Sequence, residues 1–561
     1  MFRGPCIRTG VPGATPAKRF AGGPRRVVIK SACDEAAAGR GDAMFTDNPQ
    51  FEDRLARLEK WKAAGVDPFG NRIDNLISIN ESRNLHRPDT PHAGGPSARV
   101  AGRIMLRRDI GKLIFITLSD WTGRIQIALA RQFLEKDWNK AKLLEAGDIA
   151  WFSGKVGHTN TGEVTVWADN FGLCAKSLLP PPEKFHGLAD TELRYRRRYL
   201  DLLANADSRE VFLARSGIVR FIREFLHGRG FVEVETPMMQ AVPGGAAARP
   251  FRTRHNALDL DLYLRVSPEL YLKRLLVGSL ERVFEINRNF RNEGIDTSHN
   301  PEFTMLELYQ AYSDLAGMLE LTQTLVSALA EQSWRRIHPA AAKPERLELP
   351  YGGRVIDFSP PFERLAYMDL FRRHVGADLV DVAAVRRSAD ECHIENTAEK
   401  AHEVLVDELF ARCVEPVLHT LDRPVFVYDY PAALCPLTRR KPGREHLAER
   451  FELYVAGMEL ANAYTELNDP FIQMETFTAQ LAGQKQGESM ARMDHDFIMA
   501  LGYAMPPAGG LGIGIDRLAM LLLNRTSIRD VVLFPLLKPY FPPDAAPDAG
   551  GEIHSRNRPA E

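Results

Sequence analysis

The chain has 561 residues, of which 45% are hydrophobic and 26% are charged, and its formal net charge is −1. This composition predicts a globular protein of about three domains, and the balanced charge excludes a strongly basic nucleic-acid binder. Any RNA contact must therefore come from local basic patches, of which two stand out, Arg107-Arg108 and residues 194–199.

The cysteine pattern and the hydropathy exclude further classes of protein. The six cysteines stand at positions 6, 33, 174, 392, 413 and 435, and no two of them have the close spacing of a zinc site. Cys392 and His393 are adjacent but lack a third ligand, so reduced thiols are favoured over a metal site or a disulfide framework. No apolar run approaches the ~18 residues that span a bilayer, so no membrane segment is expected.

The first segment, residues 1–44, is rich in Gly, Ala and Pro and carries seven basic residues before its first acidic residue, Asp34. Such a composition is typical of an organellar transit peptide. A disordered extension, or a wrongly assigned start upstream of Met44, explains it as well, because Gly and Pro disfavour an amphipathic targeting helix. A disordered or targeting extension is predicted, with the cytoplasm as the expected compartment and an organelle as the alternative.

Residues 45–96 are predicted to form a helical N-terminal segment. Phe51, Leu58 and Trp61 recur at helical spacing, and Asn48, followed by a proline, suits the N-cap of this helix. The opposite face is basic. A solvated face and an RNA contact both remain open for it.

Residues 97–178 alternate short apolar strands with Gly-containing turns, and one helical stretch interrupts them. This pattern predicts a five-stranded OB-fold β-barrel. Such barrels bind single-stranded nucleic acid by stacking bases on aromatic side chains beside polar groups. By itself, the barrel predicts a domain that binds an oligonucleotide or a sugar.

Residues 179–207 are predicted to be a linker, because Pro180-Pro181-Pro182 forms a stiff spacer. The basic patch at residues 194–199 lies within this segment. Two interpretations are open for the patch: a contact with RNA, or an arginine-rich surface of ion pairs between domains.

Residues 208–237 predict a helix followed by a strand. Val211, Ile218 and Phe225 lie at helical spacing, and glycines from Gly228 onward end the helix. The apolar–polar alternation FVEVET then predicts the strand. A packing helix in the core is the simplest interpretation of this segment.

Two later segments are rich in glycine. Residues 243–251 form a turn of small side chains, which lets backbone approach a ligand. Residues 509–523 predict a glycine-packed strand that turns into a helix, and helix N-termini favour phosphate. Neither signal is specific by itself.

The most informative stretch is residues 282–312, which predicts a β-hairpin. Arg291 and Glu293 would share one face if the first strand continues through them, and Glu307 and Tyr309 share a face of the second strand. Arginine suits phosphate or carboxylate. The hairpin therefore fits a ligand that carries a phosphate and an amine, with an ion pair at the rim as the alternative.

Residues 449–470 alternate again and place Asn462, Tyr464 and Glu466 on one face. The glutamate adds negative charge to this face, and the amide and hydroxyl add hydrogen-bonding groups. This second polar face resembles that of the hairpin in its composition.

The remaining segments carry no signal about a mechanism. Residues 313–334 predict an amphipathic helix that packs on a core. Residues 335–450 predict an insertion of helices and strands. Residues 540–561, rich in Pro, Asp and Gly, predict a disordered tail.

Taken together, these segments resemble the motifs of class II aminoacyl-tRNA synthetases, in the form found in the lysyl-tRNA synthetases of subclass IIb. Residues 282–312 resemble motif 2, residues 208–237 motif 1 and residues 509–523 motif 3, and the resemblance covers roughly residues 45–539. It implies an α+β fold: the OB-fold barrel, followed by a catalytic domain at residues 208–539 with a mainly antiparallel sheet flanked by helices.

The resemblance also implies a reaction and its partners. Lysine would be activated with ATP to lysyl-adenylate and pyrophosphate, and then transferred to the 3′ end of its tRNA. Mg²⁺, in more than one copy, would assist, and adenine would stack between Phe303 and Arg517. A homodimer would form through the motif 1 helix and strand, without any membrane association.

The resemblance assigns roles to individual residues. Arg291 and Arg517 would be catalytic. Lysine would contact Gly245, Glu269, Arg291, Glu307, Tyr309, Asn462, Tyr464 and Glu466. ATP would contact Arg291, Glu293, His299, Asn300, Phe303, Glu452 and Arg517. The anticodon would contact Phe115 and Gln126, and the magnesium ligands would be Glu452 and Glu459.

The identity of the amino acid can be argued from charge. Glu269, Glu307 and Glu466 supply more negative charge than one α-ammonium needs, which favours a substrate with a second cation. An aspartyl or asparaginyl enzyme of the same fold would need a cationic or amide-reading pocket. A catalytically inactive RNA-binding paralogue is the alternative from another class, but the catalytic arginines and magnesium ligands are intact.

Overall fold

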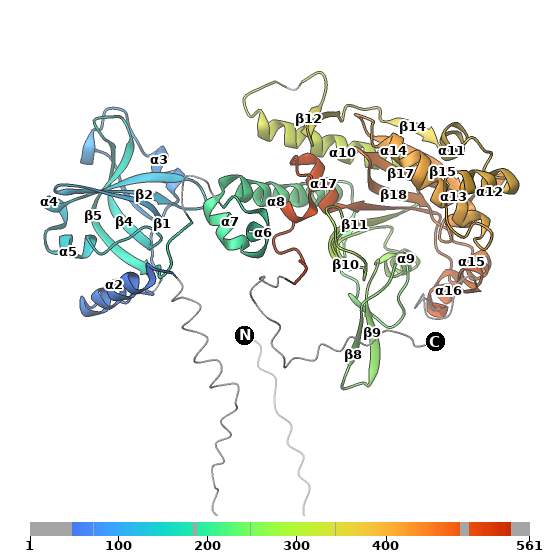
Figure 1. Cartoon of the computed structure of the whole chain (residues 1–561), viewed down its shortest axis with the longest axis horizontal. Helices are drawn as coiled ribbons and strands as arrows, with labels where there is room; N and C mark the ends of the chain where they lie inside the picture. Colours follow the sequence, from blue (N-terminus) through green and yellow to red (C-terminus); the bar gives the residue numbers. More distant parts are fainter. Residues whose placement is uncertain are drawn as a thin grey trace, which may run out of the picture. The chain divides into compact units, whose positions relative to one another are not determined.

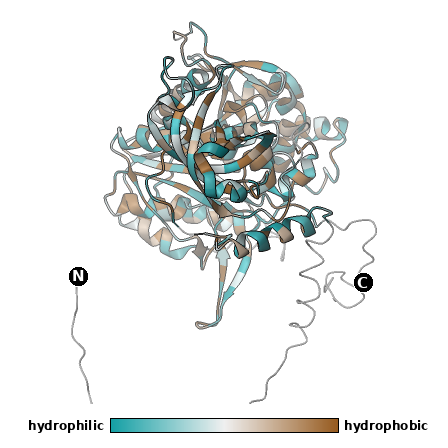
Figure 2. Ribbon diagram, turned by 90° about the vertical axis from the view of Figure 1, so that its left-hand side faces the viewer, coloured by the Kyte–Doolittle hydropathy of each residue, from teal (hydrophilic) through white to brown (hydrophobic). Residues whose placement is uncertain are grey.

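The computed structural model describes residues 48–70, 72–182, 188–246, 248–342, 344–482 and 493–539. The predicted N-terminal extension and C-terminal tail lie outside the described residues. The chain divides into two compact units, residues 1–181 and residues 182–561. Hydrophobic and hydrophilic residues are interleaved along the ribbon (Figure 2), and none of the helices in the described ranges is long and apolar enough to cross a membrane.

Five strands of the first unit close into a barrel (Figure 1). Its elements are β1 (Ser97–Ile110), β2 (Leu113–Ser119), β3 (Arg124–Ala130), α4 (Arg131–Leu134), η2 (Glu135–Asp137), α5 (Trp138–Ala141), β4 (Ile149–His158) and β5 (Val164–Ala175). The strand order is β1-β2-β3-β5-β4, and β3 pairs with β5 in parallel. Alternate residues fill the barrel, so the predicted OB-fold with its interposed helix is confirmed.

The N-terminal segment adds α2 (Phe51–Ala63), α3 (Ile79–Asn84) and η1 (His92–Gly94) to the first unit. Trp61 and Ile79 are buried in the core of the barrel, so these helices belong to the same unit. The first helix begins later than predicted. The Asn48 side chain accepts a hydrogen bond from the backbone N–H of Gln50, and this turn precedes the helix instead of capping it.

The predicted linker at residues 179–207 is wrong in its second half, where the second unit begins with α6 (Thr191–Arg196) and α7 (Arg198–Ala204). Arg198 is 1% exposed and its guanidinium lies 2.6 Å from the buried carboxylate of Asp201, which also pairs with Arg194 at 2.9 Å. Ion pairs within this unit therefore account for these two arginines of the basic patch.

The second unit is organised around one nine-stranded sheet, in the order β14-β15-β17-β18-β19-β11-β10-β6 with β16 beside β17. All its pairs are antiparallel except β14 with β15 and β10 with β6, which confirms the mainly antiparallel sheet. The strands are β6 (Val232–Glu233), β10 (Arg282–Phe290), β11 (Glu302–Ala311), β14 (Glu363–Ala366), β15 (Val425–Pro431), β16 (Arg440–Lys441), β17 (Arg444–Val455), β18 (Met458–Thr465) and β19 (Ala508–Gly514).

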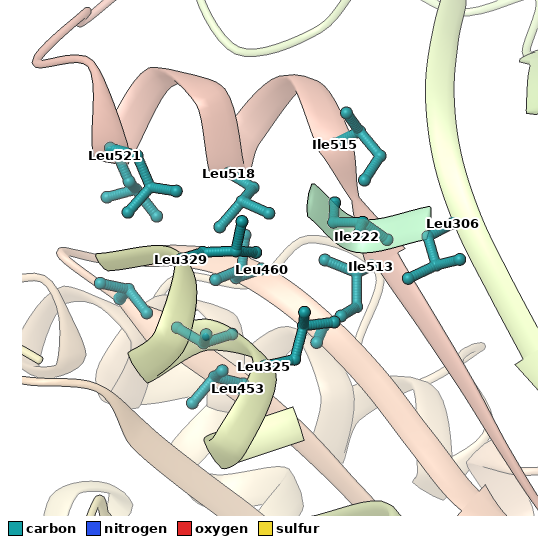
Figure 3. Close-up of a cluster of buried hydrophobic side chains, with 14 of the residues drawn as sticks. Ile222, Leu306, Leu325, Leu329, Leu453, Leu460, Ile513, Ile515, Leu518 and Leu521 are labelled. Atoms are coloured by element: carbon teal, nitrogen blue, oxygen red, sulfur yellow. The ribbon is translucent and has the colours of Figure 1, made fainter. Parts of the chain in front are cut away.

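Three helices cover one face of this sheet: α8 (Ala206–His227), α10 (Leu315–Ile337) and α17 (Ile515–Leu522). Figure 3 shows Ile222, Leu325 and Leu518 from these helices meeting Leu306 and Ile513 from the strands. Because side chains alternate along a strand, the residues next to Leu306 and Ile513 point to the opposite face. That opposite face carries the polar residues.

Smaller elements complete the second unit around this sheet (Figure 1). Two small sheets contain β7 (Met239–Gln240), β8 (Arg252–His255) and β9 (Leu260–Leu264), and β12 (Glu348–Tyr351) and β13 (Arg354–Asp357). The further helices are α9 (Glu269–Val277), α11 (Tyr367–Val375), α12 (Val382–Glu391), α13 (His402–Leu409), η3 (Phe410–Val414), α14 (Glu415–Leu418), η4 (Ala432–Leu434), α15 (Pro470–Ala482), α16 (His495–Gly502) and η5 (Ile528–Asp530).

Candidate active site

The polar face of the sheet is built on three neighbouring strands, β18, β19 and β11. Their registers align two cross-strand rows, Asn462–Gly512–Glu307 and Tyr464–Gly510–Tyr309. The middle strand therefore offers glycine at both positions. A Cβ on Gly510 would overlap the Glu466 carboxylate and lie 2.7 Å from the Tyr309 ring, so only glycine leaves this floor open.

Three buried carboxylates surround this floor: Glu269 at the start of α9, Glu307 on β11 and Glu466 just after β18. They are 3%, 5% and 1% exposed. Ser267 Oγ donates to Glu307 at 3.1 Å, and the Tyr464 hydroxyl donates to Glu269 at 2.6 Å. Burial and the charge of Glu269 raise the pKa of Glu307 to about 8. The site thus holds three carboxyl groups close together where water screens their charges poorly, which favours a cation beside them.

Glu466 has an unused acceptor. Its Oε1 has no hydrogen-bond partner among the described residues, and it lies beside the position that a Cβ of Gly510 would take. Burial raises the pKa of Glu466 to about 8, although Lys273 lowers it. Buried acceptors are almost always satisfied in proteins, so this oxygen points to a donor supplied by a ligand.

Gly245 brings backbone to the same place. Its φ of +89° is a left-handed conformation, and a Cβ there would lie 3.0 Å from Ser267 Oγ and 3.2 Å from Glu269 Cβ. The glycine-rich turn therefore approaches Glu269, as its predicted role requires.

Lys273 was missed by the sequence analysis. It follows Glu269 by one helical turn and is 0% exposed. Its Nζ donates to Glu269 Oε1 at 2.7 Å and forms an ion pair with Glu466. The i,i+4 spacing of Glu269 and Lys273 is the signal that could have found it.

Two adjoining cavities open above these residues. The larger, of about 1500 Å³, is lined by Gly245, Glu269, Glu307, Tyr309, Asn462 and Tyr464. The smaller, of about 250 Å³, is lined by His299, Phe303 and Arg517. Both are also lined by Arg291, Glu293 and Glu459. Arg291 therefore stands where the two cavities meet.

The surroundings of Arg291 differ from the sequence prediction. Strand β10 ends at Phe290, so Arg291 and Glu293 lie in the loop and do not share a strand face. The backbone N–H of Arg291 donates to Pro301 at 2.9 Å, which closes the hairpin here. The guanidinium lies 5.1 Å from the centre of the Phe303 ring, and its Nε has no hydrogen-bond partner within the described part of the chain.

His299 and Arg517 lie side by side, with 3.2 Å between their side-chain nitrogens. Arg517 also donates to the backbone carbonyl of Glu459 at 2.6 Å. Asn300 is engaged differently. Its amide donates to the Glu302 carbonyl and accepts from the backbone N–H of Leu536, so the side chain holds two segments of backbone together.

Glu452 and Glu459 lie on the neighbouring strands β17 and β18. Burial and the charge of Glu452 raise the pKa of Glu459, so an added cation would be stabilised here. Glu452 accepts hydrogen bonds of 2.7 Å from the hydroxyls of Tyr430 and Tyr454 and pairs with Arg450. Within the described ranges, no group of three or more His, Cys, Asp or Glu residues is arranged to hold a metal ion.

Arg450 and Arg215 are two further residues that the sequence analysis missed. Arg450 donates to Asn462 Oδ1 at 3.1 Å and thereby orients a residue of the floor. Arg215, on α8, lies 2.6 Å from Asp516, which also accepts from the backbone N–H of Thr304 at 2.8 Å. This contact ties together the segments that were compared with motifs 1, 2 and 3.

In the first unit, Phe115 and Gln126 lie on the outer face of the barrel. Their strand neighbours Ile114, Ile116 and Ile127 fill the core, so both side chains point outward and are half-buried. Gln126 Oε1 accepts a hydrogen bond from Thr165 Oγ1 at 2.9 Å. This contact fixes the orientation of the amide group.

Comparison with protein families agrees with both units. A family profile described as "tRNA synthetases class II (D, K and N)" matches residues 190–538. A second profile, described as an OB-fold nucleic acid binding domain, matches residues 98–173. These matches define the class of protein: a class II synthetase region preceded by an OB-fold domain.

Individual relatives narrow this class. The lysine–tRNA ligase of Pelotomaculum thermopropionicum is 46% identical over 524 residues, which cover 90% of this chain and 97% of the relative. Those of Carboxydothermus hydrogenoformans and Magnetococcus marinus are 46% and 45% identical, over 88% of this chain and 98% and 97% of the relatives. The chain therefore belongs to the lysine–tRNA ligase family of class II tRNA synthetases.

Proposed function

We propose that this chain is a lysine–tRNA ligase. It activates lysine with ATP, forming lysyl-adenylate and pyrophosphate, and transfers the lysyl group to the 3′ end of its tRNA. Family membership supports the reaction. The observation that carries the choice of amino acid is the group of buried carboxyls at the larger cavity: Glu269 and Glu307 line it, and Glu466 lies beside Gly510 with an Oε1 that has no donor among the described residues.

Lysine lies in the larger cavity with its side chain toward the floor. Glu307 and Glu466 flank the ε-ammonium, and the backbone of Gly245 and the carboxylate of Glu269 receive the α-ammonium. Tyr309, Asn462 and Tyr464 complete the walls. An ammonium with three N–H donors satisfies several acceptors at once, which suits a site of buried carboxylates.

ATP occupies the smaller cavity. Arg517 and His299 bind the γ-phosphate end, Phe303 stacks on adenine and Glu293 accepts from its amino group. Asn300 acts through the backbone that it orders, because both ends of its side-chain amide are already engaged. The Arg517 guanidinium covers the other face of the adenine.

The chemical step relies on position and charge. A carboxylate is a competent nucleophile at neutral pH, so adenylate formation needs no general base. Arg291, between the two cavities, bridges the lysine carboxylate and the α-phosphate as negative charge develops between them.

Glu452 and Glu459 have the carboxylate groups that an Mg²⁺ site requires. This ion takes one or two carboxylates together with phosphate oxygens and water, so a site with fewer than three protein ligands is compatible with it. When bound, Mg²⁺ supplies positive charge beside the phosphates. Arg450 and the two tyrosines hold the Glu452 carboxylate in place.

The first unit binds the anticodon of the tRNA. Phe115 stacks on a base and the amide of Gln126 reads a base edge, from the outer face of the barrel.

Two copies of the chain associate through residues 208–237, and the enzyme acts in the cytoplasm.

The proposal is tested by ATP–pyrophosphate exchange with each of the twenty amino acids in turn. The expected result is exchange that depends on lysine alone. Exchange with aspartate or asparagine would assign the chain to another member of the fold, and the absence of exchange with any amino acid would indicate an inactive RNA-binding paralogue.

A further inference from the structure

A protein cation lies against the buried carboxylates at the larger cavity. Lys273 is fully buried, and its ammonium contacts Glu269 at 2.7 Å and forms an ion pair with Glu466. It also lies 5.5 Å from the centre of the Tyr464 ring. Two of the three carboxylates that receive lysine in the proposed function are therefore already in contact with a protein ammonium.

The charges of this cluster balance only when the two ammonium groups of a bound lysine are included. Among the described residues, the cluster contains three carboxyl groups and one ammonium, that of Lys273, so full ionisation of the cluster would leave two negative charges that this ammonium does not balance. Lysine carries two ammonium groups. The nearby charges of Arg265 and Glu285 pair with each other at 2.7 Å and leave this balance unchanged.

The titration of the floor agrees with this balance. Burial lowers the pKa of Lys273, but Glu269 and Glu466 together raise it above its usual value, so the ammonium stays charged. The carboxyls of Glu307 and Glu466, with pKa raised to about 8, ionise fully only when a further cation arrives. The other titratable groups that face the cluster are Glu269 on α9 itself, Tyr309 on β11 and Tyr464 on β18.

We propose that Lys273 is a positioning residue for lysine recognition. It holds one oxygen of Glu269 and one oxygen of Glu466, so that Glu466 Oε1 remains directed at the substrate. Without this ammonium, the three buried carboxyl groups hold more protons than they do in the wild type, and the substrate must displace these additional protons on binding. This inference rests on the proposed function.

The experiment compares wild type, Lys273→Met and Arg274→Met. Methionine replaces lysine at similar length without the charge. Arg274, the next residue of the same helix, pairs with Asp494 at 2.7 Å and with Asp496 at 2.9 Å, away from the floor. Its variant is a matched control for the loss of an ion-paired cation from α9.

The first readout is the number of protons released when lysine binds, measured by calorimetry at neutral pH in two buffers of different ionisation enthalpy. Lys273→Met is expected to release about one proton more than wild type, while Arg274→Met matches wild type. Equal proton release by Lys273→Met and wild type would overturn the inference.

The second readout separates KM from kcat in ATP–pyrophosphate exchange. Lys273→Met is expected to raise the KM for lysine about tenfold or more at neutral pH, since each unit of pKa changes the ionised fraction up to tenfold. The kcat and the KM for ATP should stay close to wild type. A fall in kcat as large as the rise in KM would mean that Lys273 only maintains the fold.

A double variant covers the case in which Lys273→Met does not fold. Lys273→Met with Glu466→Gln replaces the ion pair by neutral partners, and it should release more protons than Glu466→Gln alone, because Glu269 has lost its ammonium. Equal release would overturn the inference. Absence of lysine-dependent exchange in wild type would instead refute the proposed function.

Discussion

The two ends of the active-site cavity are built in different ways. At the lysine end, Glu269, Glu307 and Lys273 are almost fully buried and engage one another or their neighbours in hydrogen bonds and ion pairs. At the proposed nucleotide end, Glu293 and His299 are exposed.

This difference follows from what each end must recognise. Discrimination of one amino acid from similar ones requires a site whose polar groups are fixed beforehand, because an incorrect ligand then leaves buried groups unpaired. A nucleotide brings large charges of its own, so mobile, solvated side chains can bind it without a rigid cage. Arg291 lines both cavities, and in the proposed function it serves both ligands.

The largest effect is expected from Arg291→Lys, which tests the junction between the two ends. Lysine keeps the charge but loses the bidentate fork. Because the contacts of Arg291 strengthen in the transition state, adenylate formation should slow about a hundred- to thousandfold at saturating lysine and ATP, with little change in either KM.

Single-turnover kinetics measure this rate. Arg288→Lys is the control, because Arg288 lies on the same hairpin but is 40% exposed and 3.7 Å from Glu302. A rate for Arg291→Lys as close to wild type as that of Arg288→Lys would place Arg291 in a rim ion pair.

Gly510→Ala tests how rigid the lysine end is. The new Cβ would overlap the Glu466 carboxylate, and overpacking of this kind costs about 1–3 kcal/mol. The KM for lysine should rise about tenfold or more, while the KM for ATP changes little. Gly509→Ala is the control, since its Cβ would meet Met318 on the helix-covered face at 2.7 Å. Equal effects of both variants on the KM for lysine would indicate a general loss of packing.

Phe115→Ala extends the comparison to the first unit. Loss of one base-stacking contact is expected to weaken tRNA charging by about 1–3 kcal/mol, without affecting pyrophosphate exchange. Both activities are measured on the same preparation. If they fall together, Phe115 packs the barrel and does not face RNA.

A separate effect concerns the pH dependence of stability and not activity. Burial and Glu269 raise the pKa of Glu307 to about 8, so between the ordinary carboxyl range and pH 8 the native state holds a proton that the unfolded state has released. The free energy of unfolding of the ligand-free protein should therefore fall as pH rises toward about 8, and lysine should offset the fall. Chemical denaturation at a series of pH values measures it. A curve for Glu307→Gln parallel to that of wild type would contradict the assignment.

Local patterns predicted the parts of the fold that depend on neighbouring residues. The period of two placed Glu307 and Tyr309 on one face of a strand, and glycine-punctuated alternation predicted the barrel. The resemblance named the residues that the cavities bring together. Its assignments of individual contacts remain predictions until they are measured.

The features that the sequence did not reveal depend on contacts between distant residues. Asp201 is buried and pairs with Arg198 and Arg194. This ion-pair network stabilises helices in a segment that was predicted to be a linker. The role of Gly510 depends on strand registers that bring Tyr309 beside it. The Arg215–Asp516 pair joins residues about three hundred positions apart, beyond the reach of any periodicity.

The most direct test is the binding of lysine and of ATP with Mg²⁺, each measured by calorimetry on Glu466→Gln and Arg517→Ala. Loss of a buried charge-assisted hydrogen bond costs about 1.5–3 kcal/mol. Glu466→Gln should therefore weaken the binding of lysine about ten- to hundredfold and leave the affinity for ATP unchanged. Arg517→Ala should weaken the binding of ATP and leave the affinity for lysine unchanged. If either variant weakened both ligands equally, the division of the cavity into a lysine end and a nucleotide end would be wrong.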